Sequence, residues 1–188
     1  MTRVILIHGW EGDPHQEWRP WLKSILENEG IEVIVPGMPD TLHPQMAPWV
    51  EKISETVGES GDQTYLVGHS LGCIAILRYL DSVNASVAIE GAVLVAGFGK
   101  NLHYSGYKGE LDSFFSSPLD WERIRGNCLR FVSIHSDNDT FVDISNSKLF
   151  KEKLGAESLI EHNMGHFSGS DGILELPIVY NKLVELIK

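Results

Sequence analysis

One serine in the sequence has neighbours whose spacing suits nucleophilic chemistry. In the segment TYLVGHSLGCIAIL (64–77), Ser70 lies two residues from Gly68 and two residues from Gly72. A strand-forming run ends at Gly68 and an apolar helical pattern begins near Leu71, so GHSLG fits a G-x-S-x-G turn between a strand and a helix. In so sharp a turn, side chains at positions 68 and 72 would collide with nearby backbone. The pattern predicts a nucleophilic Ser70; a turn that merely needs small residues is the alternative.

A serine hydroxyl becomes a good nucleophile only when a base removes its proton. In chains with this motif, the acid and then the histidine follow the serine. His166 lies in the loop NMGHFSGSDG after the last predicted strand and is the expected base. The other histidines fit a buried or rim position on an apolar strand (His8, His69, His135 and His162) or lie in loops outside the expected order (His15, His43 and His103).

The acid is expected after the predicted strand RFVSIH, which continues into SDNDTFVD at residues 136–143. Asp139 is the preferred candidate because it lies at the centre of this loop. Asp137 remains the alternative, and Asp143 suits a turn or a helix cap. The same stretch lacks the oxygen ligands that an EF-hand calcium loop requires at its later positions.

Two backbone amides are expected to stabilise the oxyanion that forms when serine attacks a carbonyl. The Leu71 N–H lies at the predicted helix start, and the Trp10 N–H lies in HGWEG (8–12), directly after the first predicted strand. Trp10, Phe98 and Phe167 follow strand ends and are expected to wall a small apolar acyl pocket, although each also suits ordinary packing at the rim. No metal or cofactor is expected.

Short apolar runs rich in valine and isoleucine alternate with helical patterns along the chain. The runs are nearly continuous, which is typical of strands covered on both faces. They lie at residues 4–8, 32–36, 64–68, 92–97, 130–135 and 158–162, and the main helical patterns lie at 17–30, 47–58, 71–83, 145–155 and 176–188. This alternation predicts an α/β fold: a mostly parallel, doubly wound sheet between two helical layers, with ligands beyond the carboxyl ends of the strands.

One connection, residues 97–127, is long and contains only a short helical pattern near PLDWERI. Loops of this length usually carry function or disorder. It is too short for a large lid, so we expect an accessible site and short-chain substrates.

Length and charge narrow the class of protein further. The 188 residues are expected to form one domain, and the net charge of −11 argues against nucleic acid and anionic membranes as partners. The two cysteines form no C-x-x-C pair, so a disulfide framework or zinc site is not expected. The N-terminus leads directly into a strand pattern, without a signal peptide, and no apolar run approaches the ~20 residues of a membrane span. A cytoplasmic protein with reduced thiols is predicted.

The motifs HGWEG, GHSLG, SDNDTFV and GHF, in this order, resemble those of the α/β-hydrolases. The sequence is most similar to small serine hydrolases related to retinoblastoma-binding protein 9 and the YdeN-like esterases. The supporting stretches cover nearly the whole chain: HGWEGDPHQEWRPWL, VIVPGMPDT, YLVGHSLGCIAILRYL, PLDWERI and GHFSGSDGILELP. The resemblance implies a compact six-stranded fold without a large lid, and ester hydrolysis by Ser70, Asp139 and His166 with the Trp10 and Leu71 amides.

The resulting hypothesis is a serine hydrolase that cleaves small carboxylic esters through an acyl-enzyme. A thioesterase or amidase with the same triad is an alternative, and so is a protein-binding module that has kept the fold without catalysis. A retinoblastoma-type partner is not expected, because neither cysteine lies in an L-x-C-x-E motif.

Overall fold

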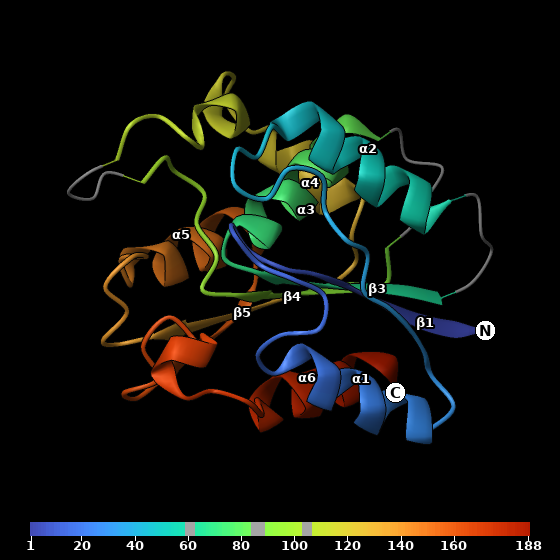
Figure 1. Cartoon of the computed structure of the whole chain (residues 1–188). Helices are drawn as coiled ribbons and strands as arrows, with labels where there is room; N and C mark the ends of the chain where they lie inside the picture. The colour runs from blue at the N-terminus through green and yellow to red at the C-terminus, as the bar shows by residue number, and fades with distance from the viewer. Residues whose placement is uncertain (59–62, 84–88, 103–106) are drawn as a thin grey trace.

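The described part of the computed structural model, residues 1–58, 63–83, 89–102 and 107–188, contains one sheet of six strands (Figure 1). The strands pair in the order β2-β1-β3-β4-β5-β6, and every pair is parallel. Their bounds are β1 (Thr2–Ile7), β2 (Glu32–Ile34), β3 (Gln63–His69), β4 (Gly91–Val95), β5 (Phe131–Ser136) and β6 (Glu157–Glu161).

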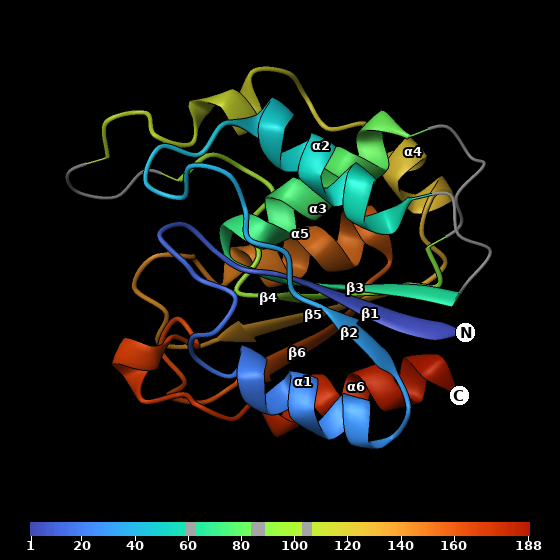
Figure 2. The same cartoon turned by 45° about the vertical axis from the view of Figure 1, so that its right-hand side comes forward.

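Helices cover both faces of the sheet (Figure 2). On one face lie α1 (Arg19–Asn28) and α6 (Pro177–Ile187); on the other lie α2 (Met46–Val57), α3 (Leu71–Ser82), α4 (Trp121–Gly126) and α5 (Ser145–Leu154). Two short 3₁₀ helices, η1 (Asp112–Phe115) and η2 (Gly169–Asp171), lie in the loops. The predicted three-layer, doubly wound α/β fold is confirmed. None of the helices within the described ranges is both long and apolar enough to cross a membrane.

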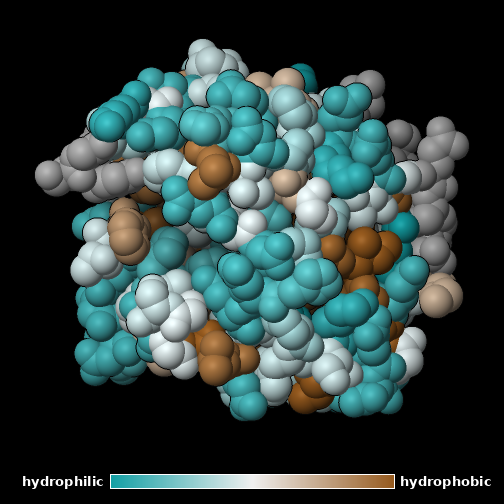
Figure 3. Space-filling view, in the orientation of Figure 1, coloured by the Kyte–Doolittle hydropathy of each residue, from teal (hydrophilic) through white to brown (hydrophobic). Residues whose placement is uncertain are grey.

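The central strands are apolar at nearly every position because their side chains supply two cores. In β1, Ile5 and Ile7 face the core under α2 and α3, whereas Val4 and Leu6 face the core under α1 and α6. Because most apolar side chains lie in these cores, the face of the molecule shown in Figure 3 is mostly hydrophilic. The edge strand β6 departs from the expectation of full coverage, since it has one neighbouring strand and its Ile160 is 47% exposed.

The strand order reverses beside β1, and ligand sites of parallel sheets commonly lie at such a reversal. From β1 the chain crosses to β2 on one side, then returns to β3 on the other side of β1. The connections after β1 and β3 therefore lead to helices on opposite faces of the sheet, α1 and α3, and ligands bind at the carboxyl edge between such connections. The long connection after β4 contributes η1 and α4 in its described part, and His103 lies outside the described residues.

Candidate active site

The turn between β3 and α3 holds Ser70 in a strained conformation. Its φ of 53° and ψ of −116° are rare for a residue with a side chain, and its N–H donates to the Val95 carbonyl at 2.9 Å. A Cβ on Gly72 would lie 2.3 Å from the Ile7 carbonyl oxygen, and one on Gly68 would lie 2.8 Å from a backbone nitrogen of α3. Both glycines are therefore required by close backbone approach.

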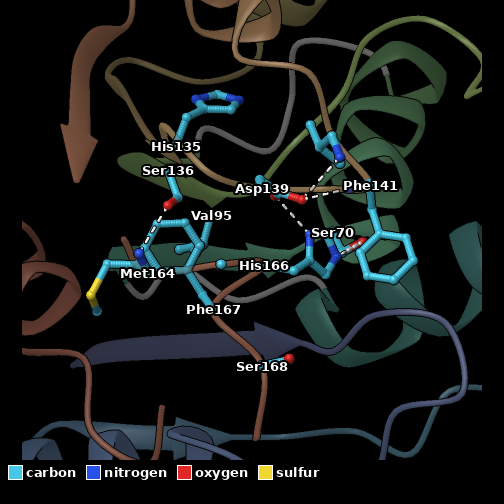
Figure 4. Close-up of polar contacts among 12 residues, drawn as sticks. Ser70, Val95, His135, Ser136, Asp139, Phe141, Met164, His166, Phe167 and Ser168 are labelled. Carbon is cyan, nitrogen blue, oxygen red and sulfur yellow. Dashed lines mark hydrogen bonds and ion pairs between the residues drawn. The ribbon is translucent and has the colours of Figure 1, made fainter. Parts of the chain in front are cut away.

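The Ser70 hydroxyl is the first member of a line of three side chains (Figure 4). Its Oγ lies 2.8 Å from Nε2 of His166, and Nδ1 of His166 lies 2.8 Å from Oδ2 of Asp139. The other oxygen of Asp139 accepts the N–H groups of Phe141 at 2.8 Å and Val142 at 3.0 Å, which fixes the carboxylate. The Asp139 side chain is 3% exposed, so its contact with the imidazole is largely shielded from water. The imidazole can therefore accept the serine proton at Nε2 while Nδ1–H faces the carboxylate.

Asp137, the alternative acid, contacts a different histidine. It lies 2.6 Å from Nδ1 of the exposed His162 and accepts the N–H of Asn163 at 2.9 Å. The hydrogen bond from Asn163, followed by that from His162, lowers the pKa of Asp137. Asp143 accepts the N–H of Ser145 at 2.8 Å, at the start of α5. These contacts are structural, as expected for turn and cap residues.

A row of polar side chains, which begins at the last residue of β5, holds the loop that carries His166. Besides Asp137 and Asp139, Ser136 accepts the N–H of Met164 at 3.0 Å, and Asn138 accepts the N–H of Gly165 at 2.8 Å. Sequence reasoning did not identify Ser136 or Asn138. The four consecutive polar residues SDND could have indicated these contacts, because serine, asparagine and aspartate side chains often form hydrogen bonds with nearby backbone groups in loops.

A cavity of about 350 Å³ opens over Ser70. Trp10 and Leu71 line it, and a Cβ on Gly9 would lie 3.3 Å from Cβ of Ser70, so the loop after β1 packs directly against the serine. The apolar part of the lining is Trp10, Leu71, Leu102, Leu111 and Phe141, and the polar part includes Glu11, Glu17, Ser168 and Ser170. Among the described residues, no lysine or arginine lines this cavity.

The structure corrects the expected pocket wall at two positions. Phe98 and Phe167 are fully buried and do not line the cavity. Phe98 turns into one core, where its ring lies 5.9 Å from that of Phe115, and Phe167 belongs to the core on the opposite face. Trp10 does line the cavity, as do Leu102 and Leu111. Those leucines were missed because they lie in the long connection, outside any periodic pattern.

A larger depression of about 730 Å³ lies over α2, α3 and α4, away from Ser70. Its buried Arg78 donates to the backbone carbonyls of Phe114 and Ser117 and thus holds the connection after η1.

Both cysteines, Cys73 and Cys128, are free and buried, and burial raises the pKa of each thiol. Within the described ranges, no group of three or more histidine, cysteine or acidic side chains could hold a metal ion.

The chain is similar to known serine hydrolases along nearly its whole length. The family described as "Serine hydrolase" matches residues 4–185. The putative hydrolase YdeN of Bacillus subtilis is 34% identical over 184 residues, which cover 97% of this chain and 95% of that protein. The serine hydrolase RBBP9 of Rattus norvegicus is 25% identical over 186 residues, 98% of this chain and 87% of that protein. The crystal structure of the ydeN gene product from B. subtilis has a TM-score of 0.89 and covers 100% of this chain and 99% of that chain.

Proposed function

The chain belongs to the serine hydrolase family and has the α/β-hydrolase fold, and we propose that it cleaves small carboxylic esters. Ser70 is the nucleophile, His166 the general base, and Asp139 the acid that orients the imidazole. The observation that carries this proposal is the continuous pair of 2.8 Å contacts from Asp139 through His166 to Ser70.

The reaction proceeds in two steps through an acyl-enzyme. Ser70 Oγ forms a bond to the ester carbonyl carbon while its proton moves to Nε2 of His166. The imidazolium returns this proton to the leaving alcohol as the ester C–O bond breaks. A water molecule, deprotonated by the same nitrogen, then attacks the acyl carbon. The acyl C–Oγ bond breaks as His166 returns the proton to Oγ, which releases the acid and free Ser70.

The backbone amides of Trp10 and Leu71 stabilise the oxyanion in both steps. Both residues line the cavity beside Ser70, and Leu71 is the first residue of α3, where helix N–H groups have no partner within the helix. Loss of one such donor typically costs ~10²–10³ in kcat.

The shape of the cavity favours short acyl groups. Its volume of about 350 Å³ is at the small end of ligand sites, and its apolar lining includes Leu111 and Phe141. The same triad would serve a thioesterase or amidase, and a non-catalytic binding module remains the alternative from another class. The single-domain organisation and cytoplasmic location stay predictions from the sequence.

Labelling with a fluorophosphonate tests the catalytic assignment. We expect the wild-type protein to be labelled and the Ser70→Ala variant, with an unchanged circular dichroism spectrum, to remain unlabelled. A folded wild-type protein that resists the probe would support the binding module instead.

A matched substrate panel then tests the reaction class. Acetyl and butyryl p-nitrophenyl esters should be cleaved faster than the decanoyl and lauroyl esters, and faster than the matching thioester and anilide. A preference for the long chains, as in a lipase, would contradict the small-ester proposal. A preference for the thioester or anilide would leave the triad in place and move the assignment to that class.

A further inference from the structure

The segment that carries His166 is strained on both sides of this residue. Asn163, Gly165 and Phe167 have φ values of 58°, 55° and 57°, in the left-handed region. For a residue with a side chain, such a conformation costs about 1–3 kcal/mol and persists only when surrounding contacts enforce it. The position of the proposed base therefore depends on what holds this segment.

Side chains hold the main chain of His166 at both of its polar groups. Its N–H donates to Oδ2 of Asp171 at 2.9 Å, and its carbonyl oxygen lies 2.8 Å from Nε2 of His69. Asp171 also explains the glycine before the base, since a Cβ on Gly165 would lie 2.3 Å from Oδ1 of Asp171. His69 is the residue directly before Ser70, so one turn of the chain carries the nucleophile and also contacts the base.

The protonation of His69 follows from its partners. A carbonyl oxygen only accepts hydrogen bonds, so Nε2 of His69 carries the hydrogen and donates it to His166. His69 is 4% exposed, and burial, followed by the nearby His166, lowers the pKa of His69 to about 4. The ring is thus neutral near pH 7, with its single N–H directed at the base segment. Its Nδ1 lies 3.6 Å from Glu17, whose carboxylate pairs with the buried Arg19 at 2.5 Å.

We propose that His69 is a positioning residue for catalysis: its Nε2–H fixes the carbonyl of His166 and thereby keeps the base aligned with Ser70. This inference rests on the proposed function. The nucleophile and the base lie 96 residues apart in sequence, and the contact between His69 and His166 ties the two segments together beside the Ser70–His166 hydrogen bond. Asp171 restrains the preceding peptide group through the N–H of His166.

Substitution by two residues of nearly equal shape isolates this hydrogen bond. Glutamine can place an amide N–H where Nε2 of histidine lies, whereas methionine has similar length and no N–H. We expect His69→Met to lower kcat on a short ester by about tenfold to a hundredfold with little change in KM, because a misplaced base slows chemistry rather than binding. His69→Gln should recover most of this loss.

The control is His43→Met, at an exposed histidine outside the cavity, which should leave kcat unchanged. Thermal unfolding and the rate of fluorophosphonate labelling are measured on every variant. If His69→Met does not fold, His69→Asn replaces it, because its shorter amide does not reach the Nε2 position. The proposal is overturned if the variants with and without the N–H have equal kcat, or if kcat falls only in proportion to the folded fraction. In either case, labelling of the wild-type protein at Ser70 would still support the proposed hydrolase function. A wild-type protein that is not labelled would contradict both the hydrolase function and the role of His69.

Discussion

A methyl group at residue 72 would occupy space that the end of β1 already fills. The Cβ of a Gly72→Ala variant would lie 2.3 Å from the carbonyl oxygen of Ile7 and 2.8 Å from that of His8, where ordinary contacts begin at 3.4 Å. Relief requires a shift of about 1 Å between α3 and β1. The displaced segment leads directly to Trp10, the proposed oxyanion donor, so we expect both the free energy of unfolding and kcat to fall.

The size of the effect follows from how little β1 can move. The strand is paired on both sides, by β2 and β3, and its residues 4–7 are at most 1% exposed. Overpacking in such a site costs about 1–3 kcal/mol or more, whereas the better helix propensity of alanine returns at most about 1 kcal/mol. We expect Gly72→Ala to lose about 2 kcal/mol of unfolding free energy. A 1 Å displacement of the donor should lower kcat by about a hundredfold.

The control substitution is Gly126→Ala, at the last residue of α4, where nothing lies within 4 Å of an added Cβ. It should leave activity unchanged and leave stability unchanged or raise it by up to about 1 kcal/mol. Urea unfolding followed by tryptophan fluorescence, which reports on the buried Trp18 and Trp49, measures the free energies; kcat on a short ester measures the chemistry. If Gly72→Ala is as stable and as active as Gly126→Ala, the steric explanation of the turn is wrong.

Three further outcomes are expected. Burial lowers the pKa of His69 from 6.5 to about 4. Between these pH values, His69 is protonated in the unfolded chain and neutral in the folded chain. The free energy of unfolding should therefore fall as the pH drops from about 6.5 to about 4, by up to about 3 kcal/mol from this group. Urea titrations at several pH values should find a weaker pH dependence of this free energy in His69→Gln. An equal pH dependence in the two proteins would contradict a neutral, buried His69. Asp139→Asn should lower kcat by about 10⁴, whereas Asp137→Asn, away from the imidazole of the base, should cost less than about tenfold; steady-state kinetics that reverse this order would make Asp137 the acid. Glu11 and Glu17 both line the cavity, the described lining holds no lysine or arginine, and Arg19 pairs with Glu17 behind it. Because two carboxyl groups face one such cation, an anionic ester should react about fivefold more slowly than its neutral isostere at low ionic strength, and added salt should reduce this difference in rate; a faster anionic ester would count against this charge effect.

The sequence by itself determined the features that depend on local rules. Continuous apolar runs predict buried parallel strands, and the intervening patterns predict helices, because these periodicities reflect burial of each residue's own side chain. Gly68 follows from backbone sterics within its own turn, because a Cβ there would lie 2.8 Å from the backbone nitrogen of Cys73, whereas the carbonyl that excludes a Cβ at Gly72 belongs to β1. The order of Ser70, Asp139 and His166 places each residue after a strand, and a parallel sheet brings those strand ends to one edge.

Only the tertiary structure decided which side chains face the cavity and which contacts hold the base. Phe98 and Phe167 follow strand ends as Trp10 does, yet both rings turn into the cores while Trp10 lines the cavity. The contact of His69 with the carbonyl of His166 joins residues 97 positions apart, and no local pattern encodes it. The direction of a side chain at a strand exit depends on the space that distant segments leave for it, and that space exists only once the sheet and its helices have packed.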